Sequence, residues 1–316
     1  MLPEIVAAMP WTSSFTVSHA PGSRSVTVAD SSRGTDSATA FSAAFQELVD
    51  RCIGTDAFRV LDKQHSELFS LLSWSTSPTF SNSTTINSAS NFNRDEPLSS
   101  PISSPRPKIP VVIERFAAPL FGITLSGAHM IAYVKSRATE DDSGVISGLW
   151  IPRRAAHLWS SPNMLDASVA GGIASGASPL ETIIREADEE ASLPRELVRT
   201  RIRSAGVLTY LSVTQRKHGW PGEEGLVVPD VIYTYEMELP EDVVPKPKDG
   251  EVGAYKLMSV GDVQSALLAG DFKPDAAVVV VDFLIRHGVI TAENERNFVA
   301  INMHLHRRLP FRIAGG

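Results

Sequence analysis

A glycine-rich loop that runs directly into an acidic helix is the feature that most constrains this chain. Residues 170–193 read AGGIASGASPLETIIREADEEASL. Ser178, Pro179 and Glu181 form a helix start: a serine caps the first turn, proline suits the first helical position, and glutamate closes a capping box. The sequence therefore predicts a helix from about Pro179, whose buried stripe at a period of 3.6 residues comprises Leu180, Ile183, Ile184, Ala187 and Ala191.

Three glutamates share one flank of this predicted helix. Glu186, Glu189 and Glu190 stand at positions i, i+3 and i+4, so their side chains are neighbours. Like charges at this spacing repel, and a bound cation would offset that cost. Carboxylate oxygens suit Mg²⁺ or Mn²⁺, which bridge to substrate phosphates. Arg185, one turn before Glu189, can hold that carboxylate in place. The alternative interpretation is a solvent-exposed helix face with salt bridges.

The spacing of these residues resembles the Nudix box, G-x5-E-x7-R-E-U-x-E-E-x-G-U, with Gly171 as its first glycine and Arg185 as its arginine. The resemblance implies an α/β/α sandwich with a mixed sheet. It also implies a metal site made by Glu186, Glu189 and Glu190 with a loop carbonyl of Ala170 or Gly171. Two positions depart from the pattern: Ala177 replaces the first glutamate, and Ser192 replaces the second glycine. These departures leave a reduced activity open.

A longer similarity covers roughly residues 120–311. It is similar to the Nudix subgroup of fungi and plants that is related to thiamine pyrophosphokinase, including the Nudix part fused to that kinase in some fungi. The matching segments are 149–154, 164–166, 169–172, 189–194, 249–252, 256–260, 272–274 and 283–288. The resemblance implies hydrolysis of thiamine diphosphate-like compounds, oxidised or damaged forms included, to the monophosphate and phosphate. The alternatives are a Nudix hydrolase of another nucleoside diphosphate derivative and a Nudix-like binding module without catalytic activity.

Further side chains are candidates for the same site. Glu251 precedes a strand, and Nudix enzymes often supply another glutamate from a later loop; its alternative is a turn residue. We assign catalytic roles to Glu189, Glu190 and Glu251, with Glu190 or Glu251 as the general base of a metal-assisted substitution at phosphorus. Arg153 and Arg154 would bind phosphate oxygens of the substrate, unless they are ordinary surface residues. Trp150 and Tyr210 would stack on a ring of the substrate, unless they are ordinary core residues.

Composition excludes several classes of protein. The net charge of −7 and the scattered basic residues argue against nucleic-acid binding. The chain has no apolar run of 18 or more residues, so we expect no membrane span. The single cysteine, Cys52, cannot form an intramolecular disulfide, which fits a reducing compartment. We expect a cytoplasmic protein, with a mitochondrial location as the alternative, and a small-molecule diphosphate as its partner. The oligomeric state is left open.

The organisation of the chain follows its changes in composition. We predict a disordered tail at residues 1–37, a small mainly helical region at 38–74, a Ser/Pro-rich disordered linker at 75–110 and the hydrolase domain at 111–316. Phe41, Ala44, Phe45, Leu48, Val49 and Cys52 give the helical region its periodicity. Strands are predicted at 120–124, 130–135, 148–152, 206–214 and 227–238, and further helices at 260–268, 275–286 and 292–306.

Overall fold

The computed structural model describes residues 1–20, 22, 24–62, 67–71, 110–136 and 145–309. These residues divide into two compact units, Met1–Phe121 and Gly122–Leu309. The linker predicted at residues 75–110 lies outside the described residues except for Pro110. The predicted start of the hydrolase domain at residue 111 differs from the unit boundary, because residues 112–114 pair with residues 68–70 and so belong to the first unit.

The first unit contains one long helix, α2, several short helices and two small sheets. Its elements are α1 (Pro3–Ala8), β1 (Phe15–Ser18), β2 (Ser25–Val28), α2 (Ser37–Gly54), η1 (Arg59–Leu61), β3 (Leu68–Ser70), β4 (Val112–Glu114) and α3 (Ala118–Phe121). β1 pairs with β2 and β3 with β4, both antiparallel. The predicted helical region is confirmed by α2, whose buried residues are Ala44, Phe45, Leu48, Val49 and Cys52.

The prediction of a disordered tail at residues 1–37 is wrong. The rings of Trp11 and Phe15 contact each other at a tilt of 47° with centroids 5.4 Å apart, and Phe15 meets Phe45 of α2 edge-on at 5.7 Å. Met9 is buried, and its sulfur lies 3.5 Å from the sulfur of Cys52. The composition of the tail is polar on average, but these few large apolar residues bury enough surface against α2 to order the segment.

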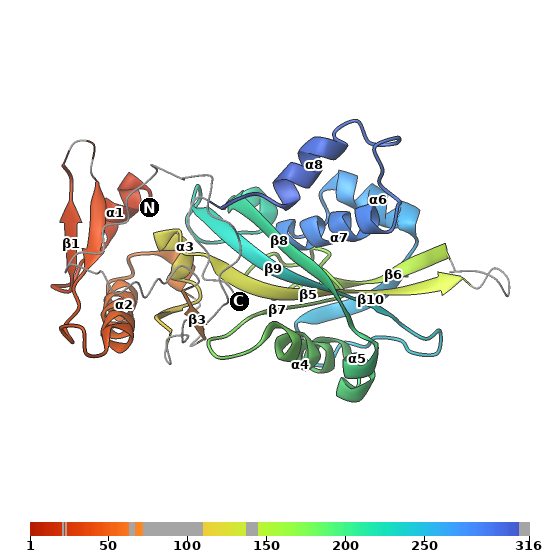
Figure 1. The fold of residues 1–316 in the computed structure, drawn as a ribbon, viewed down its shortest axis with the longest axis horizontal. Helices are drawn as coiled ribbons and strands as arrows, with labels where there is room; N and C mark the ends of the chain where they lie inside the picture. The colour runs from red at the N-terminus through yellow and green to blue at the C-terminus, as the bar shows by residue number, and fades with distance from the viewer. Residues whose placement is uncertain (21, 23, 63–66, 72–109, 137–144, 310–316) are drawn as a thin grey trace, which may run out of the picture. The chain divides into compact units, whose positions relative to one another are not determined.

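The second unit is a mixed six-stranded sheet between two layers of helices (Figure 1). Its elements are β5 (Leu125–Ser136), β6 (Val145–Arg154), β7 (Val169–Gly172), α4 (Pro179–Ala191), α5 (Arg195–Arg201), β8 (Arg203–Val213), η2 (Arg216–His218), β9 (Val227–Glu238), β10 (Val252–Met258), α6 (Val260–Ala269), α7 (Pro274–Arg286) and α8 (Phe298–Leu305). The strand order is β10-β6-β5-β9-β8, and β5 runs parallel to β9. The predicted α/β/α sandwich with a mixed sheet is confirmed.

Along one edge, strand β5 pairs with two different strands in succession, β7 and then β6. The first part of β5, Gly127 to Met130, pairs with β7, while the later part, Tyr133 to Ser136, pairs with β6. Between these two partners, the Ser168 hydroxyl donates to the carbonyl of Trp150 and accepts the backbone N–H of Ala132. β6 and β7 therefore separate at this fork.

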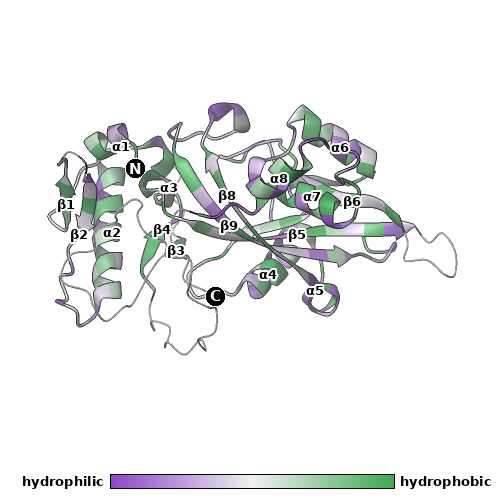
Figure 2. Cartoon of the chain, turned by 45° about the horizontal axis from the view of Figure 1, so that its top comes forward, coloured by the Kyte–Doolittle hydropathy of each residue, from purple (hydrophilic) through white to green (hydrophobic). Residues whose placement is uncertain are grey.

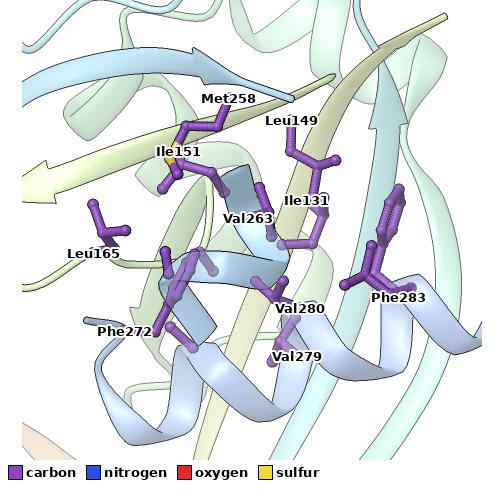
Figure 3. Close-up of a cluster of buried hydrophobic side chains, with 14 of the residues drawn as sticks. Ile131, Leu149, Ile151, Leu165, Met258, Val263, Phe272, Val279, Val280 and Phe283 are labelled. Atoms are coloured by element: carbon purple, nitrogen blue, oxygen red, sulfur yellow. The ribbon is translucent and has the colours of Figure 1, made fainter. Parts of the chain in front are cut away.

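Each face of the sheet buries its own apolar cluster. The cluster under α6, α7 and α8 includes Ile131, Leu149, Ile151, Val279, Val280 and Phe283 (Figure 3). The cluster under α4 and α5 includes Ala128, Met130, Ile183, Ile184, Ala187 and Val198. Residues alternate between the two clusters along β5, as the period of two in a strand requires. Both α4 and α5 carry hydrophobic and hydrophilic residues, as expected for helices with one buried face (Figure 2).

Several predicted element bounds differ from the structure. The strand predicted at residues 120–124 does not form, because α3 ends at Phe121 and Gly122 turns the chain at a φ of +66°. The helix predicted at 292–306 is limited to α8, since Asn294 instead accepts the backbone N–H of Thr291 in a preceding turn. The sequence also gave no prediction of β7 or α5, whereas the strand predicted after Glu251 is present as β10. The other predicted strands and helices of this unit are confirmed within a few residues.

Candidate functional site: a carboxylate cluster between the glycine loop and α4

Helix α4 begins as its sequence predicts. Ser178 accepts the backbone N–H of Glu181 at 3.2 Å, and Pro179 occupies the first turn. Ile183, Ile184, Ala187 and Ala191 are at most 1% exposed against the sheet, whereas Leu180 in the first turn is 37% exposed, contrary to its predicted burial. This packing fixes the rotation of the helix. Its glutamate flank consequently faces the backbone of β7.

Glu190 bonds directly to the glycine-rich strand. The backbone N–H of Ala170 donates to its Oε2 at 3.0 Å, and the residue is only 9% exposed. Burial raises the pKa of Glu190 well above its usual range, and the charges of Asp166, Glu186 and Glu251 raise it further, against the lowering effect of the Ala170 bond. An ionised Glu190 therefore lacks a compensating positive charge.

Glu186 lies over Gly171. A Cβ placed on Gly171 would come within 2.3 Å of Glu186 Oε1 and 2.4 Å of its Cγ. Burial raises the pKa of Glu186 to about 7; Arg185 lowers it, while the charges of Glu189 and Glu251 raise it. Position 171 thus requires glycine because the Glu186 side chain occupies the space of any Cβ there.

Arg185 holds two of the glutamates. Its Nη2 lies 2.6 Å from Glu186 Oε1, and its Nη1 lies 2.6 Å from Glu189 Oε2. Glu189 itself is more open, with 41% of its side chain exposed. The predicted contact between Arg185 and Glu189 is present in the structure, and Arg185 also reaches Glu186. The guanidinium sets the positions of both carboxylates.

Glu251 and Asp166 approach the cluster from other parts of the chain. Glu251 precedes β10, where its backbone N–H donates to Asp249 Oδ1 at 2.9 Å and its carbonyl accepts the N–H of Ala155 at 2.8 Å. Its charge raises the pKa of both Glu186 and Glu190, so the structure brings it to the predicted trio. Asp166, which is 5% exposed, acts on Glu190 in the same way and was not predicted.

The donor set suits a hard divalent cation. Glu186 and Glu190 are desolvated, and neighbouring carboxylates raise the pKa of each, so a positive charge nearby would stabilise their ionised forms. Mg²⁺ and Mn²⁺ bind carboxylate oxygens of this kind. Within the described ranges, no three His, Cys, Asp or Glu side chains are already arranged to hold a metal ion. Arg185 engages Glu186 and Glu189, so both carboxylates would have to exchange that guanidinium for the cation.

Arg153 and Arg154, the last two residues of β6, have different environments. Arg154 donates to Asp166 Oδ2 at 3.0 Å and to the carbonyls of Ser160 and Ser161 at 3.1 Å, and its side chain is 14% exposed. It fixes the loop before β7 and offers little to a phosphate. Arg153 is exposed and donates to the carbonyl of Asn163. Of the two predicted phosphate ligands, only Arg153 keeps accessible donors.

Trp150 and Tyr210 lie on opposite faces of the sheet. Trp150 packs against the cluster under α4, whereas Tyr210 belongs to the cluster under α7. The two rings therefore cannot both stack on one ligand, which corrects the combined prediction. Tyr210 is 8% exposed and pairs across the sheet with Asp230.

The two departures from the Nudix box have separate locations. Ala177 lies in the exposed loop before α4, where its N–H donates to the Ala174 carbonyl. Ser192 ends α4 in a left-handed conformation with φ of 55°, which explains the family preference for glycine at this position. Its hydroxyl donates to the carbonyl of Lys246 at 2.9 Å. Neither residue contacts the glutamate trio through these bonds.

Comparisons with known proteins agree with this geometry. Residues 138–282 match the family model described as "NUDIX domain". The chain is 39% identical over 210 residues to "Uncharacterized protein YJR142W" of Saccharomyces cerevisiae, covering 64% of this chain and 58% of that protein. It is 38% identical over 183 residues to "Nudix hydrolase 20, chloroplastic" of Arabidopsis thaliana, covering 58% and 44%.

A second plant relative shows the same coverage. "Nudix hydrolase 24, chloroplastic" of Arabidopsis thaliana is 33% identical over 183 residues, which is 58% of this chain and 46% of that protein. The chain thus spans about half the length of the curated relatives it matches. Among solved structures, a C. elegans Ap4A hydrolase aligns with 52% of this chain and 99% of its own at 14% identity and a TM-score of 0.35.

No helix in the described part of this chain is long and apolar enough to cross a membrane.

Proposed function

Since residues 138–282 of this chain match the NUDIX domain family model, we propose that the protein is a metal-dependent hydrolase of diphosphate linkages. One observation carries the proposal: Glu190 bonds to the backbone N–H of Ala170, Glu186 lies over Gly171, and burial together with the charge of Glu251 raises the pKa of both carboxylates. Arg185 links Glu189 to Glu186. The Nudix-box positions and the tertiary contacts agree on the same residues.

Glu186, Glu189 and Glu190 would hold Mg²⁺ or Mn²⁺, with a carbonyl of Ala170 or Gly171 as a further ligand. The bound cation would neutralise the diphosphate and make a coordinated water more acidic. Arg185 positions two of these carboxylates before the cation binds.

The remaining steps belong to other side chains. Arg153, which is exposed, would bind phosphate oxygens. Glu251 or Glu190 accepts the proton of the attacking water. The water oxygen forms a bond to phosphorus while the bridging P–O bond breaks, and the bridging oxygen leaves on one product. With thiamine diphosphate as the substrate, the products are thiamine monophosphate and inorganic phosphate, so the atoms balance.

For the substrate, we propose thiamine diphosphate-like compounds, including oxidised or damaged forms. The support is the ordered set of sequence matches between residues 149 and 288, most of which lie outside the Nudix box. Another nucleoside diphosphate derivative is the competing substrate. The chemistry of the glutamate site is the same for both, since the site contacts only the diphosphate.

The test is a panel of diphosphates with the purified full-length chain. With Mg²⁺ present, hydrolysis measured by chromatography of the products should be fastest for thiamine diphosphate or its oxo and oxy analogues, compared with nucleoside diphosphate sugars and dinucleotides, which would yield two monophosphates. The double variant Glu189→Gln, Glu190→Gln should lose at least a hundredfold in kcat. No turnover of any diphosphate, or full turnover by the double variant, would refute the hydrolase proposal.

A second candidate is a binding module without catalysis. Arg185 already neutralises Glu186 and Glu189, and Ala177 and Ser192 depart from the Nudix box. Calorimetric titration together with chromatography of the products separates the candidates: diphosphate binding with Mg²⁺ but no hydrolysis over hours supports the binding module, whereas hydrolysis that the double variant abolishes supports the hydrolase.

A further inference from the structure

An open pocket of about 370 Å³ lies where three loops of the second unit meet. The loops are residues 155–168 after β6, residues 214–226 after β8 and residues 270–273 after α6. The basic side chains that line the pocket are Arg153, Arg216 and Lys217. Guanidinium and ammonium groups around one opening suit an anion, and the oxygens of a phosphate group match the N–H donors of an arginine.

Backbone hydrogen bonds tie these three loops together. The N–H of Ser161 in the first loop donates to the carbonyl of Gly219 in the second at 2.8 Å. The N–H of Leu165 donates to the carbonyl of Asp271 at 2.9 Å, and the N–H of Lys273 donates to the carbonyl of Leu165 at 2.9 Å, which joins the first loop to the third. The main chain therefore fixes the walls of the pocket, and a ligand can bind without the cost of ordering them.

The first two loops contact each other backbone to backbone. A Cβ at Gly219 would lie 2.7 Å from the Cα of Ser161, and Gly219 has a φ of +74°. Ser161 and Asn163 also adopt left-handed conformations, with φ of 48° and 61°. The Arg153 guanidinium holds this segment by donating to the carbonyl of Asn163. Strained conformations that the surrounding structure maintains cluster at ligand sites.

The positive charge of the pocket is available to a ligand. Arg216 Nε lies 3.6 Å from Glu224 Oε2, but 60% of the Arg216 side chain is exposed, so water screens this ion pair. Lys217 is exposed and has no ion-pair partner within the described residues. Arg153 keeps N–H donors besides the one that is bonded to Asn163. An anion can therefore bind without displacing a buried carboxylate.

Asp271 is the acidic residue of the same lining. An ionised carboxylate accepts hydrogen bonds and donates none, so it repels an anion unless that anion carries a proton. At neutral pH inorganic phosphate retains at least one proton, whereas sulfate has none. A phosphate monoester loses its last proton with a pKa of about 6. A carboxylate among basic groups therefore favours inorganic phosphate over both of these anions.

We propose that this pocket is a selective binding site for inorganic phosphate. The basic side chains of the lining bind the phosphate oxygens, and the Asp271 carboxylate accepts the proton that the phosphate retains. The pocket borders the turn between α6 and α7, whereas the glutamate trio lies on α4, so the two sites are distinct. Inorganic phosphate is a product of the proposed reaction, but its binding here does not depend on that reaction.

The first test is calorimetric titration of the full-length chain with sodium phosphate at pH 8 in EDTA, which keeps divalent cations from the glutamates. Phosphate should bind roughly tenfold or more tightly than sulfate or a phosphate monoester. The double variant Arg216→Gln, Lys217→Gln should bind phosphate about tenfold or more weakly than the unsubstituted protein.

The matched control for this variant is Arg201→Gln, Arg203→Gln. It removes two exposed cations at the other end of β8 and should change the phosphate affinity by less than about twofold. Equal weakening in both double variants, or no binding of phosphate by the unsubstituted protein, overturns the proposal.

A second test uses Asp271→Asn, which replaces the carboxylate by an amide that can donate to an unprotonated oxygen. Sulfate should gain about tenfold or more in affinity, so that the preference for phosphate falls to within about threefold. Asp262→Asn removes an exposed carboxylate in the first turn of α6 and should keep the preference. A preference that survives in Asp271→Asn overturns the proposal, because the carboxylate then does not select the protonated anion.

Failure of the proposed function gives a different result. The variant Glu189→Gln, Glu190→Gln should bind phosphate in EDTA within about twofold of the unsubstituted protein, whether or not any diphosphate is hydrolysed. Loss of phosphate binding in this variant would place the anion at the glutamates and overturn the pocket site. A chain that binds phosphate through Arg216 and Lys217 but hydrolyses no diphosphate refutes the proposed function and supports the phosphate site.

Discussion

The Glu186 side chain occupies the space that a Cβ at position 171 would need. The ideal Cβ lies 2.3 Å from Glu186 Oε1 and 2.4 Å from Cγ, far below the contact distance of two heavy atoms. The clash involves Cγ as well as the carboxylate, so rotation of the end of the side chain cannot relieve it. The glycine-rich strand and the acidic helix are therefore fitted to each other at this point.

Gly171→Ala should displace Glu186 and lower kcat with Mg²⁺ by about one to two orders of magnitude. We also expect a lower melting temperature, because the whole Glu186 side chain from Cγ outward must move and only 15% of it is exposed. Gly261→Ala is the matched control: its Cβ would approach nothing closer than Ser259 Oγ at 4.0 Å, within helix α6. Equal activity of Gly171→Ala and the unsubstituted protein would contradict this account.

The raised pKa of Glu186 predicts a dependence of stability on pH without metal. Its folded-state pKa of about 7 lies above the usual 4.5, so its contribution is complete below pH 4.5 and is lost as the pH rises through 7. Glu186→Gln should remove that loss and be more stable than the unsubstituted protein at pH 8, measured by urea unfolding in EDTA.

The same comparison at pH 5 is the control, since Glu186 is largely protonated there and the two proteins should differ less. Mg²⁺ at pH 8 should stabilise the unsubstituted protein more than Glu186→Gln, because a cation needs the ionised carboxylate. An equal stability difference at both pH values would show that Glu186 titrates normally.

Substitution by methionine should affect stability at Arg154 and substrate binding at Arg153. Arg154→Met removes the partner of buried Asp166, which should destabilise the protein by about 3 kcal/mol. Arg153→Met removes an exposed side chain and should cost less than about 1 kcal/mol, but raise KM for the diphosphate severalfold. Urea unfolding and steady-state kinetics of both variants check this. A stability loss in Arg153→Met equal to that in Arg154→Met would refute the distinction.

Ser192 offers a test of backbone strain. Its φ of 55° favours glycine, and its hydroxyl bond to Lys246 offsets part of the cost. Ser192→Ala keeps the strain and loses the bond, whereas Ser192→Gly relieves the strain. Ser192→Gly should thus be more stable than Ser192→Ala by about 1 kcal/mol in urea unfolding. If alanine is the more stable of the two, the left-handed conformation does not control this helix end.

Local sequence signals predicted the helices whose apolar residues recur with a helical period. The cap at Ser178 and the stripe from Ile183 to Ala191 predicted α4 because a helix is specified by neighbours within four residues. The apolar periodicity before Cys52 predicted α2 in the same way. Short elements failed: β7 has four residues and two glycines, so nothing in its own sequence distinguishes it from a loop. Its strand character comes from pairing with β5.

The order of the first 37 residues could not be predicted for a related reason. Their average composition is that of a tail, and only a few apolar residues pack against α2. Average polarity gives no information about which of those residues meet a partner 30 residues later. The contact between Phe15 and Phe45 is a property of the fold.

By itself the sequence determined the acidic helix and the identity of the three glutamates, because capping, periodicity and motif spacing are all local. Tertiary structure alone decided which groups surround them. It buried Glu190 against Ala170, brought Glu251 and Asp166 to the cluster, and separated Trp150 from Tyr210 onto opposite faces of the sheet. Desolvation and long-range charge depend on distances between residues far apart in the chain, and only the folded sheet sets those distances.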